Sequence, residues 1–102
     1  MGHDTYAKIG EDEIAYQRYN AGDNDARILY RCLGMDLYDA GCSGNGESVN
    51  IKIDVVEHAI KDVTSDVYKR TLEDKNYLLI FLNKVVTEMN ARKKEEVTFD
   101  LW

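Results

Sequence analysis

The sequence contains one strictly alternating stretch, Val49-Asn50-Ile51-Lys52-Ile53, in which every second residue is a β-branched aliphatic and the residues between are polar. A period of two is typical of a β-strand with one face toward the core and the other toward solvent. We therefore predict a strand over 49–53, with Val49, Ile51 and Ile53 on its buried side. The elements before and after this strand then decide the fold class.

Helical patterns follow the predicted strand. Asp54 stands where a helix cap is expected, and Glu57 three residues later completes a variant of the capping box. The first predicted helix spans about 55–63 and buries four apolar residues, Val56, Ala59, Ile60 and Val63. A longer helical segment runs from 67 to about 93 without Gly or Pro, although the polar residues 73–76 could divide it in two.

The longer helical segment has two apolar stripes. One comprises Tyr68, Leu72, Leu79, Leu82, Val86 and Met89, and the other comprises Leu78, Phe81 and Val85. A single sheet needs only one stripe to cover it, and an exposed second stripe forms a patch of a size that soluble monomers rarely tolerate. We therefore expect a homodimer with Leu78, Phe81 and Val85 at its interface. The alternative is that the 55–63 helix covers this stripe within one subunit.

The first part of the chain predicts a β-hairpin. Residues 4–9 and 13–19 are rich in strand formers, and they flank Gly10-Glu11-Asp12, which is typical of a three-residue hairpin loop. Strict alternation through the second strand places Ile14 and Tyr16 on the same face of the sheet.

Two further segments complete the predicted fold. A helix over about 25–33 has helical apolar spacing and is ended by Gly34. Residues 97–102 alternate again and finish in tryptophan, so we expect a final strand that docks in the sheet. The chain over 1–102 is therefore predicted to be one α+β domain in the order ββαβααβ. About four mostly antiparallel strands form its sheet, and the helices pack on one face.

Charge and composition narrow the classes of partner. The formal net charge is −6, and residues 1–47 carry nine acidic against four basic side chains, which disfavours a nucleic-acid backbone as a partner. No apolar run approaches the roughly 20 residues that cross a bilayer, and Met1-Gly2-His3-Asp4 lacks the basic and apolar regions of a signal peptide. We therefore expect a cytoplasmic protein whose two cysteines, Cys32 and Cys42, are reduced.

The main candidate for a ligand site is a glycine-rich loop that precedes the 49–53 strand. Three of the seven glycines fall within six residues, and the candidate residues are Asp39, Gly41, Cys42, Ser43, Gly44, Asn45 and Gly46, together with His3. Successive backbone N–H groups in such a loop can form a nest for an anion. Glu47 stands where a P-loop needs lysine, and a strand follows where a dinucleotide fingerprint needs a helix. The competing interpretation is a long turn that leads into the strand.

No catalytic constellation can be assembled from the sequence. Cys42 and Ser43 are possible nucleophiles, but a nucleophile needs a nearby base, and His3 and His58 are the only histidines. No two candidate ligands have the spacing of a zinc site, so we expect no metal and no cofactor. The seven tyrosines, five of them before residue 39, indicate a recognition surface or ordinary use in strands and core.

Parts of the sequence resemble small proteins of tailed phages and prophages that have no assigned activity. The likeness covers roughly the first half of the chain, and it rests on Met1-Gly2-His3-Asp4, Glu13-Ile14-Ala15-Tyr16 and Tyr38-Asp39-Ala40-Gly41-Cys42-Ser43-Gly44-Asn45-Gly46. The resemblance implies a bacterial host cytoplasm and an accessory role, such as modulation of a host factor. It assigns no catalytic residue.

Two functions follow as expectations. The first is a non-enzymatic protein-interaction module, a phage accessory or host-modulating protein that binds a protein partner and itself. The alternative is a small-ligand binder, for an anion or a nucleotide, or a minor enzyme that uses the glycine-rich loop over 39–48.

Overall fold

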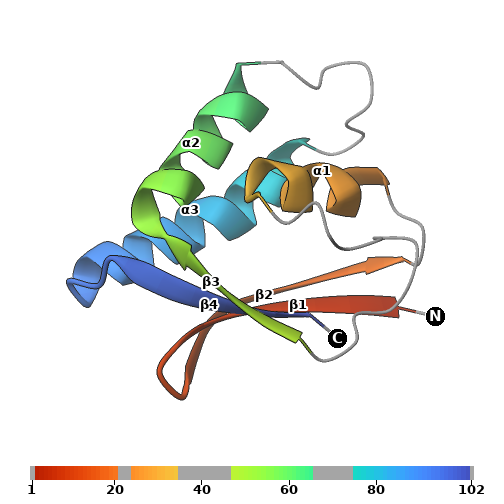
Figure 1. Cartoon of the computed structure of the whole chain (residues 1–102). Coiled ribbons are helices and arrows are strands. Elements are labelled where there is room, and N and C mark those ends of the chain that lie inside the picture. The colour runs from red at the N-terminus through yellow and green to blue at the C-terminus, as the bar shows by residue number, and fades with distance from the viewer. Residues whose placement is uncertain (1, 21–23, 35–46, 66–74, 102) are drawn as a thin grey trace.

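The fold is an antiparallel sheet of four strands with three helices on one of its faces (Figure 1). The computed structural model describes residues 2–20, 24–34, 47–65 and 75–101. The predicted α+β class and the order ββαβααβ are confirmed. The elements are β1 (Gly2–Ile9), β2 (Asp12–Asn20), α1 (Asn24–Cys32), β3 (Glu47–Lys52), α2 (Ile53–Thr64), α3 (Lys75–Ala91) and β4 (Glu96–Leu101).

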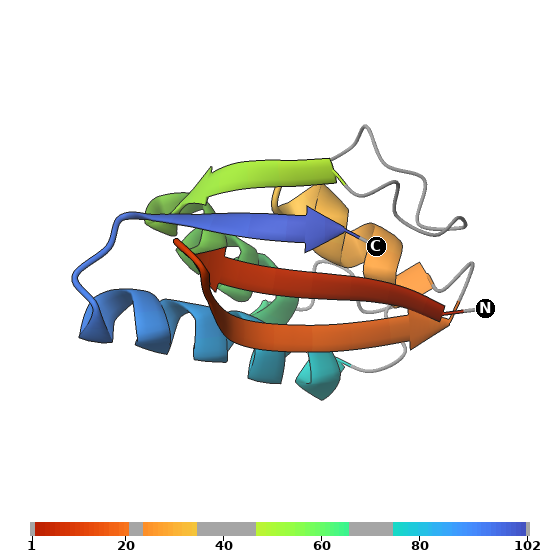
Figure 2. The same ribbon diagram turned by 90° about the horizontal axis from the view of Figure 1, so that it is seen from below.

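The C-terminal segment forms a central strand of the sheet. The strand order is β2-β1-β4-β3, so β4 lies between the first and the third strand (Figure 2). Phe99 of β4 pairs with Ala7 on one side and with Val49 on the other. β4 therefore has a neighbouring strand on each side. Its sequence alternates because the helices cover only one face of the sheet. This leaves β2 and β3 as the two edge strands.

The first hairpin is tighter than predicted and contains a bulge. Gly10 and Glu11 form the turn, because Asp12 already pairs with Ile9, and Gly10 has the left-handed φ of 63° that such a turn requires. The register shifts between Ala7 and Lys8, which leaves Ile14 as the extra residue.

The bulge reverses the alternation of β2, so the prediction that Ile14 and Tyr16 share a face is wrong. Ile14 belongs to the core together with Tyr19, whereas the side chain of Tyr16 is exposed. One extra residue in a strand exchanges the two faces for every residue on one side of it.

The predicted strand over 49–53 is confirmed apart from its end. Ile53 is the first residue of α2, although its amide still donates to the carbonyl of Glu95 at 2.8 Å. Asp54 therefore lies in the first turn and does not cap the helix. Its Oδ1 accepts from the amide of Val55 at 3.0 Å, and Lys52 occupies the cap position without a side-chain hydrogen bond.

The core lies between the sheet and the helices, and α3 contributes both of its apolar stripes to it. Leu78, Phe81 and Val85, expected at a subunit interface, are 0%, 2% and 0% exposed within one subunit. Phe81 lies against Phe99 of β4, with 6.0 Å between the ring centroids, and α2 packs alongside α3. Within one subunit, the 55–63 helix therefore helps to cover this stripe, as the alternative interpretation predicted. Self-association itself stays a prediction, and it needs a different surface.

Candidate functional site

The glycine-rich loop lies outside the described residues. Asp39, Gly41, Cys42, Ser43, Gly44, Asn45 and Gly46 all fall in the segment 35–46. The backbone of His3 belongs to β1, where it pairs with Tyr19 of β2. The ligand-binding hypothesis for this loop therefore stays a prediction.

The most distinctive described surface is the side of the sheet that faces away from the helices, which we call the open face (Figure 2). No helix covers this side in the described part of the chain. Alternate residues of all four strands contribute side chains to it. These residues include Asp4, Tyr6, Lys8, Tyr16, Arg18, Ser48, Asn50, Thr98 and Asp100.

Two tyrosines form the apolar part of the open face. Tyr6 and Tyr16 are directly paired across β1 and β2, and their ring centroids lie 4.9 Å apart with the planes tilted by 35°. The Tyr16 hydroxyl donates to Oδ1 of Asp4 at 2.6 Å, and this hydrogen bond is the main cause that raises the pKa of Tyr16. Arg18 also lies 3.9 Å from the same carboxylate oxygen. The exposed Tyr16 ring is therefore held in position by the Tyr6 ring and by the hydrogen bond to Asp4.

A charged cluster adjoins the tyrosine pair. Lys8 Nζ lies 2.8 Å from Oδ2 of Asp100, and the hydroxyl of Ser48 donates to Oδ1 of the same carboxylate at 2.5 Å. The contact with Lys8, followed by that with Ser48, lowers the pKa of Asp100, and the hydrogen bond to Asp100 in turn raises the pKa of Lys8. Both groups are therefore held in their charged forms at neutral pH. They fix the shape of the open face and are not poised for proton transfer.

The polar row of the open face continues to the β3 edge. The hydroxyl of Thr98 donates to Oδ1 of Asn50 at 2.7 Å, across the pairing of β4 with β3. Lys8 also lies over the Tyr6 ring, 5.7 Å from its centroid. Hydrogen bonds and ion pairs thus link side chains of all four strands, and these contacts hold the side chains of the open face in place.

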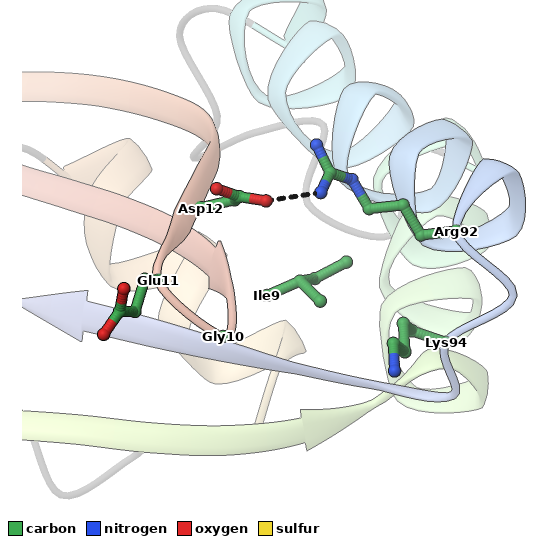
Figure 3. A pocket seen from close by; sticks show the side chains of 6 residues that line it. All are labelled: Ile9, Gly10, Glu11, Asp12, Arg92 and Lys94. Carbon is green, nitrogen blue, oxygen red and sulfur yellow. Dashed lines mark hydrogen bonds and ion pairs between the residues drawn. The ribbon is translucent and has the colours of Figure 1, made fainter.

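A shallow depression of about 480 Å³ lies at the hairpin end of the molecule (Figure 3). Its lining comprises Ile9, Gly10, Glu11, Asp12, Arg92 and Lys94. Arg92 Nη1 lies 2.9 Å from Oδ2 of Asp12, and its Nη2 lies 3.9 Å from Glu88. Because two carboxylates neutralise this guanidinium, it is not a strong anion anchor. The depression holds no nucleophile with a base among its lining residues.

The outer edge of β2 is covered by one side chain of α3. The Tyr77 hydroxyl donates to the carbonyl of Arg18 at 2.8 Å and accepts from the amide of Arg18 at 3.3 Å. Gln17 Nε2 donates to the backbone carbonyl of Tyr77 at 2.5 Å, and the Tyr19 hydroxyl donates to Oε1 of Gln17. The ring of Tyr19 meets that of Tyr77 edge-on, with 5.6 Å between centroids. These contacts fix the start of α3 against β2.

The described part of the chain contains neither a cluster of metal ligands nor a helix that could span a membrane. Residues 2–20, 24–34, 47–65 and 75–101 contain no group of three or more His, Cys, Asp or Glu side chains that could hold a metal ion. His58 lies on the exposed side of α2, 3.5 Å from Asp62. None of the described helices is both long and apolar enough to cross a membrane.

Comparison with known protein families, curated proteins and solved structures finds no match for this chain. The site must therefore be interpreted from its own residues. The excess of tyrosine was the sequence signal for the open face, but the bulge at Ile14 concealed which β2 residues reach it. No local pattern indicated that Tyr77 would reach Arg18, 59 residues earlier in the chain.

Proposed function

We propose that the protein is a non-enzymatic interaction module that binds a protein partner through the open face of its sheet. The observation that carries the proposal is the Tyr6–Tyr16 pair, held by Asp4 in a face that none of the described helices covers. Tyrosine is enriched in protein–protein interfaces because its ring offers a large apolar area and its hydroxyl a hydrogen bond.

The charges of the open face also favour a protein partner. Lys8 and Arg18 are each accompanied by a carboxylate, Asp100 and Asp4 respectively. Basic groups that are already paired with carboxylates attract a phosphate backbone weakly. The open face suits a polar protein surface with both signs of charge, because its hydrogen-bonding groups are already positioned.

The biological setting of the proposal rests on the resemblance to tailed-phage and prophage proteins. On that basis we place the protein in a bacterial host cytoplasm, as an accessory factor that modulates a host protein. The glycine-rich loop over 39–48 is not offered as a second site, because no described residue supports it.

The test compares the capture of host proteins by three forms of the purified chain. The wild type, Tyr16→Ala and the control Ile80→Ala are immobilised in turn and exposed to a bacterial lysate, and the retained proteins are quantified by mass spectrometry. Tyr16 is 46% exposed on the open face, and Ile80 is 70% exposed on α3, so both substitutions remove a large exposed side chain.

A true partner is retained by the wild type and by Ile80→Ala and is lost with Tyr16→Ala. Calorimetry with the purified partner should then show that Tyr16→Ala weakens binding by roughly thirtyfold or more, which is the cost of a hot-spot residue. Circular dichroism must show that the variant is folded. Equal retention by both variants, or no specific retention by the wild type, contradicts the proposal.

A further inference from the structure

The two edge strands of the sheet differ in how far their outward backbone groups are protected from pairing with another chain. The β2 edge carries a bulge at Ile14, and Tyr77 occupies both backbone groups of Arg18. Bulges and covering side chains are devices by which proteins prevent an edge strand from pairing with another chain. The β3 edge has a continuous register against β4 from Glu47 to Lys52, without a bulge, and the whole sequence has no proline.

The hydrogen bond from Ile53 to Glu95 determines which groups of β3 point outward. In the β3–β4 register, positions 53 and 95 continue the series that pairs Ile51 with Val97, so the odd-numbered residues of β3 bond to β4. The backbone N–H and C=O groups of Ser48, Asn50 and Lys52 therefore point away from β4. The C=O of Lys52 stands at the N-cap of α2 and accepts the first hydrogen bond of that helix. In the described part of the chain, no hydrogen bond to the N–H and C=O groups of Ser48 and Asn50 or to the N–H of Lys52 is found.

We propose that the β3 edge is the interface of a homodimer, in which β3 pairs with β3 of a second copy in antiparallel orientation. The two-fold axis passes beside Asn50, which pairs with Asn50 of the second copy. The two sheets join into one continuous sheet, and the open faces of both copies remain accessible. This inference is independent of the proposed binding at the open face.

The register follows from the outward-pointing residues. Centring the pairing on Asn50 sets Ser48 opposite Lys52 of the second copy. Both backbone groups of Asn50 then find partners, and the N–H of Lys52 donates to the C=O of Ser48. Centring it on Lys52 sets two lysines opposite each other, which is unfavourable. A register that sets Ser48 opposite Asn50 leaves Lys52 without an outward-pointing partner on β3. The Asn50-centred register is therefore the one in which each of the three outward-pointing residues pairs with the second copy.

Apolar side chains beside the edge support the same pairing. Val49, Ile53 and Val55 pack against the core but are only partly buried. In the Asn50-centred register, Val49 lies opposite Ile51 of the second copy on the helix side of the joined sheet. β-branched cross-strand pairs of this kind stabilise antiparallel sheets. The second copy thus supplies both the missing backbone hydrogen bonds and an apolar neighbour for the β3 edge.

The mass of the protein in solution tests the dimer. We expect the wild type to sediment at twice 11.7 kDa at micromolar concentration. Asn50→Lys sets two lysines opposite each other at the axis, with Lys52 of the other copy on the diagonal, and should give a folded monomer. Asn83→Lys makes the same exchange on the exposed side of α3 and should leave the dimer intact. A wild-type monomer, or an Asn50→Lys dimer, overturns the proposal.

Two further variants test the register. Mixing Asn50→Lys with Asn50→Glu should restore a dimer that contains one copy of each, because only a self-paired residue brings the two opposite charges together. In a Cys42→Ser background, Asn50→Cys should form a disulfide-linked dimer under mild oxidation, since the Cα atoms of such a pair lie about 5.5 Å apart, within disulfide reach. Asn83→Cys is the matched control. Equal cross-linking of both, or no recovery on mixing, contradicts the Asn50-centred axis.

Discussion

The hydroxyl of Tyr77 satisfies both backbone groups of Arg18, donating to its carbonyl at 2.8 Å and accepting from its amide at 3.3 Å. A neighbouring strand would offer this residue the same two partners. One side chain of α3 therefore provides, near the C-terminal end of β2, the hydrogen bonds that a fifth strand would provide. Among the described residues, no side chain occupies the outward backbone groups of β3 in this way, and this difference between the two edges is the basis of the proposed dimer.

Tyr77→Phe should uncover the β2 edge while leaving the ring against Tyr19. We expect the free energy of unfolding to fall by about 1 kcal/mol, since water can replace the hydroxyl at the exposed Arg18 groups. The amide of Arg18 should exchange faster with solvent than in the wild type. Urea unfolding and amide exchange measure the two effects.

Tyr16→Phe is the matched control for this prediction. It removes a tyrosine hydroxyl from the same strand, but that hydroxyl bonds to Asp4 on the open face. The exchange of the Arg18 amide should not respond to it. If both variants accelerate this exchange to the same extent, Tyr77 is not the group that protects the edge.

A buried pair of hydroxyls should show strong coupling. Thr5 Oγ1 and the Tyr30 hydroxyl lie 2.5 Å apart, and both residues are at most 1% exposed. The same burial raises the pKa of Tyr30 well above its usual range. Thr5→Val and Tyr30→Phe should each lower the free energy of unfolding by about 1–3 kcal/mol, because each leaves a polar group without this partner in the core. The double variant should cost clearly less than the sum, and strictly additive costs would sink this account.

The charged cluster on the open face predicts a loss of stability in acid. Contacts with Lys8 and Ser48 lower the pKa of Asp100 in the folded state. The contribution of Asp100 to the free energy of unfolding is therefore present above the pKa of an unfolded aspartate, about 3.9. It is lost as the pH falls through the lowered pKa. The pKa of Lys8 is raised in the folded state. Its contribution to the free energy of unfolding is therefore present below the pKa of an unfolded lysine and is lost as the pH rises through the raised pKa. Carboxyl resonances of Asp100 can follow the acid transition directly.

Ser48→Ala offers the test of the Asp100 assignment. It removes the second hydrogen bond to the carboxylate while leaving Lys8 in place, so the pKa of Asp100 should rise toward its ordinary value. The acid unfolding transition of the variant should accordingly become shallower. An unchanged Asp100 titration in this variant would show that the hydroxyl does not stabilise the carboxylate.

The local periodicity of the sequence was sufficient to predict the order of the elements. The alternation over 49–52 and 97–101 reflects strands with one face against the helices, and the helical spacing over 55–63 reflects a helix with one face against the core. Each of these patterns lies within a few residues, so it does not depend on knowing where the rest of the chain lies. This is why the fold class could be predicted while contacts between distant segments could not.

The misplaced features depend on a single inserted residue or on long-range contacts. The bulge at Ile14 reverses the faces of β2 without leaving a signal in the alternation. Leu78, Phe81 and Val85 form a second stripe whose cover depends on the position of α2, which no local pattern gives. For the candidate site, tyrosine content indicated a recognition surface, but composition could not identify Tyr16 as its exposed member or Tyr77 as the cover of β2.

Amide exchange at Arg18 and Asn50 tests most directly the claim that the sheet is closed at β2 and pairs with a second copy at β3. Both amides point away from their own sheet, so they can be compared within one sample. We predict that the Arg18 amide is protected at every protein concentration, whereas the Asn50 amide is unprotected in dilute solution and becomes protected as the concentration rises. An Asn50 amide whose exchange does not change with concentration, or an Arg18 amide that exchanges as fast as an unpaired one, would contradict this account.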